Sequence, residues 1–320
     1  MNYPEHLTEL HGLPVYDFPL PDEQDPRLPE ADSVAWRISY DPYSDESGEN
    51  FEGRLERFLT TVDASRVRAL VIGQWGEPYE DDAGEIVDQL VAAKDRLTSL
   101  EAVFIGDLEA EEAEISWIEQ ADVTPVLDAY PGLRELSTRG NASLRFPATK
   151  HQNLRRLRFE TGGLPGEVVR GVAESDLPAL EHLEMWFGVE AYGGNATAGD
   201  LAPLLSGGRF PALRHLGLQN SEIQDEIAAA VASAPVVAQL TSLDLSMGVL
   251  TDEGAAALLD GQPLTHLDRL DLDHNYFSEP MEQRLREALE PSGVTLALSE
   301  KGDEHQWEDG DVQRYTAVAE

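Results

Sequence analysis

Leucines recur along most of this chain in the spacing Leu-x-x-Leu-x-Leu, which is its most informative feature. The motif occurs eight times, the first two copies being looser than the rest. The copies begin at Val67, Leu100, Leu133, Leu154, Leu180, Leu213, Leu240 and Leu267. The steps between them are 33, 33, 21, 26, 33, 27 and 27 residues. A period of about 20–50 residues is typical of solenoids, in which each repeat packs only on its neighbours.

Each copy alternates in the way that a β-strand does, so its residues point to two opposite faces. The leucine set must face the core, because stacking the repeats is what buries it. The third, fifth and seventh positions then line the exposed face of a parallel sheet. The segments between copies carry apolar residues at three- and four-residue spacing, which predicts helices. These segments are Glu85–Ala93, Ile115–Ala129, Gly166–Glu174, Glu222–Ala234, Glu253–Leu259 and Glu279–Leu289.

Strands and helices that alternate in one parallel sheet require right-handed crossovers, which place every helix on the same side. The sequence therefore predicts an α/β solenoid, or horseshoe, with a curved parallel sheet on the concave face and helices on the convex face. Thr251, followed by two acidic residues, is expected to cap the start of the helix over Glu253–Leu259.

Two stretches give this pattern a family resemblance. The segment from Leu240 to Leu259 contains Leu-Thr-Ser-Leu-Asp-Leu-Ser, then Leu-Thr-Asp-Glu-Gly and Ala-Leu-Leu. It resembles the repeat unit of the ribonuclease-inhibitor-like subclass of leucine-rich repeat proteins. Three short stretches also resemble a bacterial, largely actinobacterial, leucine-rich repeat family: Gly106-Asp107, Glu114–Glu119 and Ala129–Leu133. This second resemblance supplies no catalytic residues.

The chain departs from the wider superfamily at the ninth repeat position, which is often asparagine there. Only Asn141 and Asn275 hold asparagine at that position here. A continuous asparagine ladder is therefore not expected, and the curvature should be less regular than the resemblance implies.

Four segments are expected along the chain, because terminal repeats need caps to cover their apolar faces. Residues 1–32 form an extended N-terminal arm, and residues 33–66 form a capping strand and helix. About eight repeats occupy residues 67–290. Residues 291–320 form a C-terminal cap and tail, whose final residues Tyr315–Val318 are expected to dock as a strand.

Composition excludes several classes of function. The chain has 61 acidic residues and 23 lysines and arginines, which gives a formal charge of −38. A charge of this sign and size argues against binding nucleic acid or anionic membranes. No cysteine occurs, so disulfides, thiolate metal sites and cysteine nucleophiles are excluded. No apolar run approaches the ~20 residues of a membrane helix, and no signal peptide is recognisable, so we expect a cytoplasmic protein.

The usual enzymatic signatures are absent as well. The sequence contains no phosphate-binding Gly-Lys-Ser/Thr, no His-Glu-x-x-His, no Gly-x-Ser-x-Gly and no Gly-x-Gly-x-x-Gly. We therefore expect neither an enzyme nor a cofactor. A Ser-His-Asp site assembled across repeats stays open, because such triads are recognised by geometry and not by order.

Positive charge is concentrated around the shortest repeat step. The range Leu133–Arg158 holds seven basic residues and one acid. The register places Arg139, Arg156 and Arg158 on the concave face. Their outward-facing neighbours in the next two repeats are His182, Glu184, Trp186, His215 and Gln219.

Two interpretations of these eight residues remain open. In the first, they form a cationic, aromatic-edged patch that binds another protein through its acidic or carboxylate-bearing surface. Reversing the charges of Arg139 and Arg158 would then abolish partner capture without changing the thermal melt. In the second, the arginines pair internally with Glu135, Glu160 or Glu184 and only solvate the face.

His182 and His215 occupy the same register position in successive repeats. Neighbouring strands lie ~4.8 Å apart, so the two rings could touch. A metal site would require a carboxylate as well, which Glu184 could provide. A pair of histidines on an open face is more commonly a polar ladder, so we expect no metal.

The leading prediction is a monomeric, non-enzymatic protein–protein interaction module that binds its partner on the concave sheet face. The alternative is an enzyme, or an accessory subunit of a modification pathway, with its site at the repeat rim. A third interpretation is a homo-oligomeric structural protein that pairs through its sheet edges.

Overall fold

A computed structural model describes residues 4–21, 27–43, 47–302, 304–306 and 312–319. The chain forms two compact units, which we call the N-terminal unit and the C-terminal unit. The N-terminal unit consists of Tyr3–Pro147 and His151–Glu160, and the C-terminal unit of Ala148–Lys150 and Thr161–Ala319. None of the helices in the described ranges has the length and apolar character that crossing a membrane requires.

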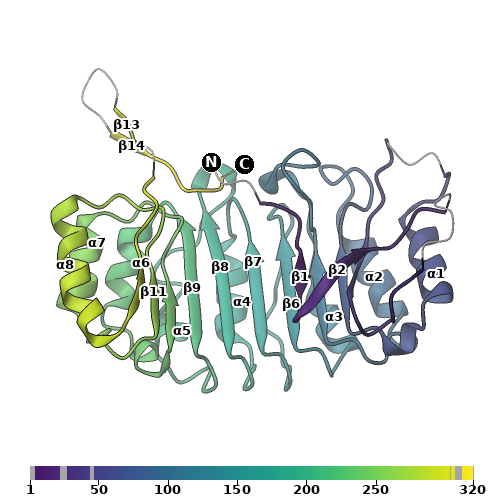
Figure 1. Cartoon of the computed structure of the whole chain (residues 1–320), viewed down its shortest axis with the longest axis horizontal. Helices are drawn as coiled ribbons and strands as arrows, with labels where there is room; N and C mark the ends of the chain where they lie inside the picture. The colour runs from purple at the N-terminus through teal and green to yellow at the C-terminus, as the bar shows by residue number, and fades with distance from the viewer. Residues whose placement is uncertain (1–3, 22–26, 44–46, 303, 307–311, 320) are drawn as a thin grey trace. The chain divides into compact units, whose positions relative to one another are not determined.

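The N-terminal unit is an α/β structure whose strands are hydrogen-bonded in chain order. These strands are β1 (Glu9–Leu10), β2 (Leu13–Asp17), β3 (Ala35–Ile38), β4 (Ala69–Ile72), β5 (Ala102–Ile105), β6 (Glu135–Arg139) and β7 (Arg156–Glu160). All neighbours are parallel except β1 and β2, which are antiparallel. Its helices α1 (Phe51–Thr61), α2 (Gly84–Ala92) and α3 (Thr124–Ala129) cover one face of the sheet (Figure 1).

The C-terminal unit repeats this arrangement. Its parallel strands are β8 (His182–Gly188), β9 (His215–Ser221), β10 (Ser242–Asp244), β11 (Arg269–Asp271) and β12 (Thr295–Ala297). Its helices are α4 (Gly166–Glu174), α5 (Ala202–Leu205), α6 (Gln224–Val231), α7 (Asp252–Asp260) and α8 (Glu279–Leu289). A separate antiparallel hairpin is formed by β13 (Glu304–Gln306) and β14 (Val312–Arg314).

Short 3-10 helices complete the connections in both units. They are η1 (Ala64–Arg66), η2 (Ile115–Trp117), η3 (Glu190–Tyr192), η4 (Pro235–Gln239) and η5 (Glu290–Ser292). The prediction of one continuous helix over Ile115–Ala129 is wrong, because this segment forms two separate helices, η2 and α3. Pro125 occupies the first turn of α3, and a proline there starts a helix but cannot continue one from earlier residues.

Strand register follows the leucine motif, as predicted. Leu183, Leu216, Leu243 and Leu270 are paired from strand to strand in the C-terminal unit, and all four are completely buried. Equal motif positions therefore stack at equal heights, which confirms the parallel α/β architecture within the unit. The cap expected at Thr251 is also present, since its hydroxyl oxygen accepts a hydrogen bond from the Glu253 amide at the start of α7.

The N-terminal arm is not simply extended, because it folds over the sheet of its own unit. Leu10, in β1, packs against a cluster on the sheet face opposite α2 and α3 (Figure 1). That cluster comprises Ala35, Ala69, Val71, Ala102 and Phe104, with Leu7, Leu13 and Val15 packed beside it. These sheet residues occupy outward positions of the repeat, and their apolar character explains why this face needs a cover.

Candidate functional site

The eight residues predicted to form one binding patch are divided between the two units. Arg139, Arg156 and Arg158 belong to the N-terminal unit. The other five belong to the C-terminal unit: His182, Glu184, Trp186, His215 and Gln219.

Arg139 is buried and bound to its own chain. Its Nε donates a hydrogen bond to Glu160 Oε2 at 2.7 Å, and its Nη1 donates to the Leu108 carbonyl at 2.7 Å. Its Nη2 donates to the carbonyl of Glu5, in the N-terminal arm, at 3.1 Å. With 3% of its surface exposed, Arg139 fastens the arm to the sheet.

The other two arginines differ in their surroundings. Arg158 keeps a third of its side chain exposed, and its Nη2 lies 2.5 Å from Glu160 Oε1. Arg156 is exposed at the start of β7. The structure thus places Arg139 and Arg158 in the internal pairing with Glu160 that the sequence left open as an alternative.

Asp107 is the centre of a second buried network that sequence reasoning missed. Its carboxylate lies 2.6 Å from Arg37 Nη2 and accepts a hydrogen bond from the Leu7 amide at 3.0 Å. Burial alone would raise the pKa of Asp107, but His6, Arg37 and Arg139 lower it overall. In return, Asp107 and Glu112 raise the pKa of His6 to about 10, so the arm is held by a charged histidine at neutral pH.

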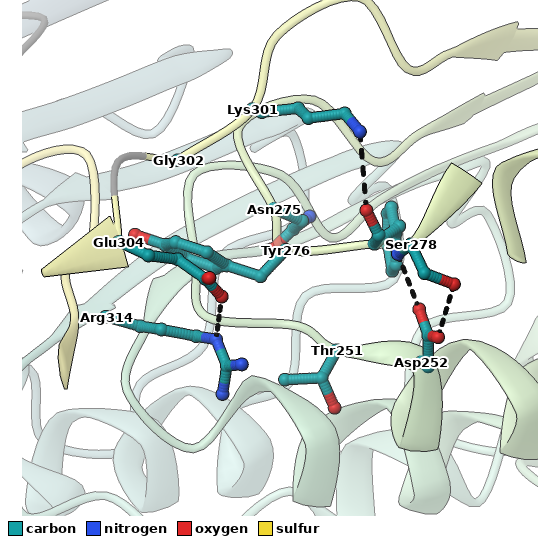
Figure 2. Close-up of a pocket in the computed structure, with 10 residues that line it drawn as sticks. Thr251, Asp252, Asn275, Tyr276, Ser278, Lys301, Gly302, Glu304 and Arg314 are labelled. Atoms are coloured by element: carbon teal, nitrogen blue, oxygen red, sulfur yellow. Dashed lines mark hydrogen bonds and ion pairs between the residues drawn. The ribbon is translucent and has the colours of Figure 1, made fainter. Parts of the chain in front are cut away.

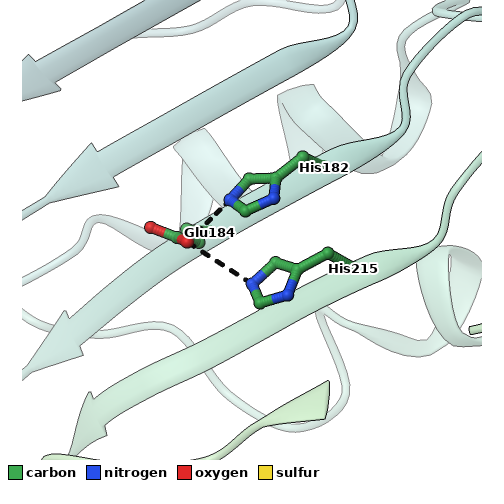
Figure 3. A group of neighbouring side chains, drawn as sticks. All are labelled: His182, Glu184 and His215. Carbon is green, nitrogen blue, oxygen red and sulfur yellow. Dashed lines mark hydrogen bonds and ion pairs between the residues drawn. The ribbon is translucent and has the colours of Figure 1, made fainter. Parts of the chain in front are cut away.

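In the C-terminal unit, His182, Glu184 and His215 converge on one point of the sheet (Figure 3). The imidazole rings stack with centroids 4.0 Å apart and an interplanar angle of 11°. Glu184 Oε1 lies 2.6 Å from His182 Nε2 and 3.4 Å from His215 Nε2. The contact expected from the shared register of the two histidines is confirmed, and about a fifth of each of the three side chains is exposed.

Residues of β9 and β10 shape this cluster. Ser242 Oγ lies 3.1 Å from His215 Nδ1, which fixes the ring so that Nε2 faces Glu184. Gly217 is paired with Glu184, and a Cβ atom at Gly217 would lie 2.9 Å from Glu184 Cγ. The absence of that side chain makes room for the carboxylate to lie against both rings.

The same face continues with acidic residues on β10 and β11. Gln219 Nε2 donates a hydrogen bond to Asp244 Oδ2 at 3.1 Å, and Arg269 Nη2 lies 2.5 Å from Asp271 Oδ2. Burial, together with the charges of Asp271 and Glu184, raises the pKa of Asp244 to about 6. This part of the face is therefore rich in negative charge at neutral pH. Trp186 is buried at its edge, with 7% of its surface exposed.

A cavity of about 550 Å³ lies near the C-terminal end of the chain (Figure 2). Its lining comes from the loops after β10 and β11 and from the segment around the β13–β14 hairpin. Its cations are neutralised within the chain, because Lys301 Nζ lies 2.6 Å from Glu282 and Arg314 Nε donates to Glu304 at 2.7 Å. The repeat pattern gives no signal for this cavity, since it forms only where the C-terminal segment docks.

Tyr276 and Asn220 hold that C-terminal segment in place. The Tyr276 hydroxyl donates to the Tyr315 carbonyl at 2.6 Å, and Asn220 exchanges two hydrogen bonds with the backbone of Val318. The segment docks as expected, but Tyr315–Val318 adopts no strand.

Comparison with known proteins identifies a related solved structure. No family model matches the chain, and no curated protein matches it. A crystal structure of a Bacteroides fragilis protein, determined by a structural genomics consortium, superposes with a TM-score of 0.79. It shares 33% sequence identity with this chain, and the match covers 89% of this chain and 78% of the Bacteroides chain.

Proposed function

This chain belongs to the same family as the Bacteroides fragilis protein, and from that premise we propose that it is a leucine-rich repeat solenoid of the ribonuclease-inhibitor-like subclass. We further propose that it is a non-enzymatic interaction module, which binds another protein on the sheet face of the C-terminal unit. The in-register leucines, and the helices that lie on one side of the strands in each unit, support the repeat assignment.

One contrast between the units carries the binding proposal. In the N-terminal unit the outward positions of β3, β4 and β5 are largely apolar, and the chain's own arm covers them. In the C-terminal unit the corresponding positions of β8 to β11 are polar or charged except for Trp186 and Gly217, and most of them are partly exposed. A partly exposed, polar and charged sheet face offers electrostatic complementarity to a polar partner surface, which is what supports this proposal.

The charge of this face indicates the kind of partner. Glu184, Asp244, Asp271 and Asp273 are outward-facing acids, and Arg269, which pairs with Asp271, balances only one of these four charges. The carboxylate-bearing partner expected from the arginines would have to compete with Glu160, which already binds Arg139 and Arg158. We therefore propose a partner that presents lysine or arginine, whose association weakens as salt screens the charges.

Affinity capture from the lysate of the source organism tests this proposal. The face variant combines Asp244→Asn with Asp271→Asn, which removes two negative charges and keeps side-chain shape. The matched control combines Glu253→Gln with Glu287→Gln, two exposed acids on α7 and α8. A partner recovered by the wild type and the control, but not by the face variant, supports the proposal. Equal recovery by all three proteins contradicts it.

A second candidate function is an enzyme or an accessory subunit of a modification pathway. The convergence of His182, His215 and Glu184 favours it, because histidine and carboxylate pairs commonly transfer protons. A His215→Gln variant separates the two functions. Whether the chain is a binding module or an enzyme, the His215→Gln variant should still capture the partner. Only if the cluster is catalytic should the variant fail to modify that partner.

A further inference from the structure

We propose that His182, Glu184 and His215 form a binding site for one divalent cation of the zinc type. The inference does not depend on the partner proposed above, because it concerns three side chains and a metal ion alone.

The three ligand atoms are already close together. One atom from each residue can be chosen so that all three lie within 4.8 Å of one another. Among the residues that the structure describes, this is the one group of three or more histidines and carboxylates with that property. Both imidazoles direct Nε2 at the same oxygen, Glu184 Oε1 (Figure 3). A small shift of the Glu184 carboxylate would make room for a cation that contacts both Nε2 atoms and Glu184 Oε1.

The backbone that carries these ligands is a rigid part of the fold. His182 and His215 are paired across neighbouring parallel strands, and Glu184 follows two residues after His182 on the same face. A ligand set on paired strands needs little ordering when the ion binds, unlike one carried on loops.

Neighbouring groups complete the arrangement that metal-binding histidines usually have. Ser242 Oγ interacts with His215 Nδ1, which orients the ring and keeps Nε2 available for a metal. Gly217 leaves the space in which Glu184 lies. The partial exposure of all three ligands provides a route for the ion to enter from solvent.

The donor set selects the class of metal. Two imidazole nitrogens and one carboxylate oxygen are a common three-residue set for Zn²⁺, with a fourth position left for water or another ligand. Mg²⁺ and Ca²⁺ prefer sites made of oxygen alone. The carboxylate of Asp244, whose charge interacts with that of Glu184, adds negative potential, which favours a cation at this position.

Isothermal titration of the metal-free full chain with Zn²⁺ tests the proposal. Excess Mg²⁺ is included, because it occupies the many surface carboxylates without competing for imidazole. The expected result is one saturable equivalent for the wild type. His182→Ala, His215→Ala and Glu184→Gln should each weaken binding more than about 100-fold, and Ser242→Ala should weaken it about 10-fold. Absence of a saturable equivalent in the wild type would overturn the proposal.

Two controls keep the outcome interpretable. His305→Ala, on β13, removes a histidine outside the cluster and should bind Zn²⁺ as the wild type does. Metal-free denaturation curves establish that each variant is folded, and Co²⁺ substitution gives a visible ligand-field spectrum that Glu184→Gln should alter. Zinc binding that survives both histidine substitutions at full affinity would place the ion elsewhere and refute the site.

Discussion

Arg139 and Glu160 form a buried ion pair across the neighbouring strands β6 and β7. The two residues are register partners, their side chains are almost completely buried, and the Nε–Oε2 distance is 2.7 Å. Arg139 also holds the carbonyl of Glu5 in the arm, so one side chain links the sheet to its cover. A buried pair of this kind is sensitive to the loss of either partner, because the remaining charge is left desolvated.

Replacing Arg139 with alanine should therefore destabilise the protein. The expected loss is about 3–5 kcal/mol in the free energy of unfolding, since the Glu160 carboxylate and two backbone carbonyls lose a donor. Urea denaturation measures it. Arg156→Ala, an exposed arginine on β7, should change stability by less than about 0.5 kcal/mol. An unchanged midpoint for Arg139→Ala would contradict the buried pair. Reversing the charge of Arg139 should likewise lower the melting temperature.

The contacts of His6 should make attachment of the arm dependent on pH. The folded pKa of His6, about 10, exceeds its unfolded value of 6.5. Its stabilising contribution is therefore complete below about pH 6.5 and is lost as pH rises through about 10. The destabilisation caused by His6→Gln should be largest near pH 6 and should narrow by about pH 10.5. Denaturation curves of both proteins at the two pH values measure this, and a constant difference would rule out the charged histidine.

Asp244, in contrast to His6, should destabilise the fold at neutral pH. Its folded pKa of about 6 lies above the ordinary value of 3.8, so its charged form is disfavoured in the fold. Its cost is absent below about pH 4, grows between about pH 4 and pH 6, and is complete above about pH 6. Asp244→Asn should therefore raise the free energy of unfolding by about 1–2 kcal/mol at neutral pH. The difference in the free energy of unfolding between Asp244→Asn and the wild type should vanish near pH 4. A difference that persists at pH 4 would contradict the charge of Asp244 as its cause.

Asn220 should be important for docking of the C-terminal segment. Its side chain is completely buried, donates to the Val318 carbonyl at 2.6 Å and accepts from the Val318 amide at 3.0 Å. Asn220→Ala should cost about 2–4 kcal/mol, because buried backbone groups lose their partners. It should also speed proteolysis near residue 315. Asn153→Ala, at an exposed loop amide, is the control that should leave both properties unchanged.

Periodicity in the sequence was sufficient to predict the strand register. Leu216 and Leu243 occupy equal motif positions, and they are paired in the sheet because strand alternation and stacking both require it. The same reasoning places His182 beside His215, and the two rings stack in the structure. Contacts within neighbouring repeats are predictable because the repeat itself fixes which residues share a face.

Contacts outside the period could not be predicted in this way. The arm and the C-terminal segment carry no repeat, so nothing in the spacing indicates that Glu5 reaches Arg139 or that Val318 reaches Asn220. A partial signal existed in the outward positions of β4 and β5, where Val71 and Phe104 are too apolar to face water without a cover.

Binding of a partner on the sheet face of the C-terminal unit is tested most directly by hydrogen exchange of the chain, with and without the captured partner. A partner on this face should slow exchange in β8, β9 and β10 and in the loops that follow them. Slowing confined to helices α4 to α8, with none in these strands, would contradict it.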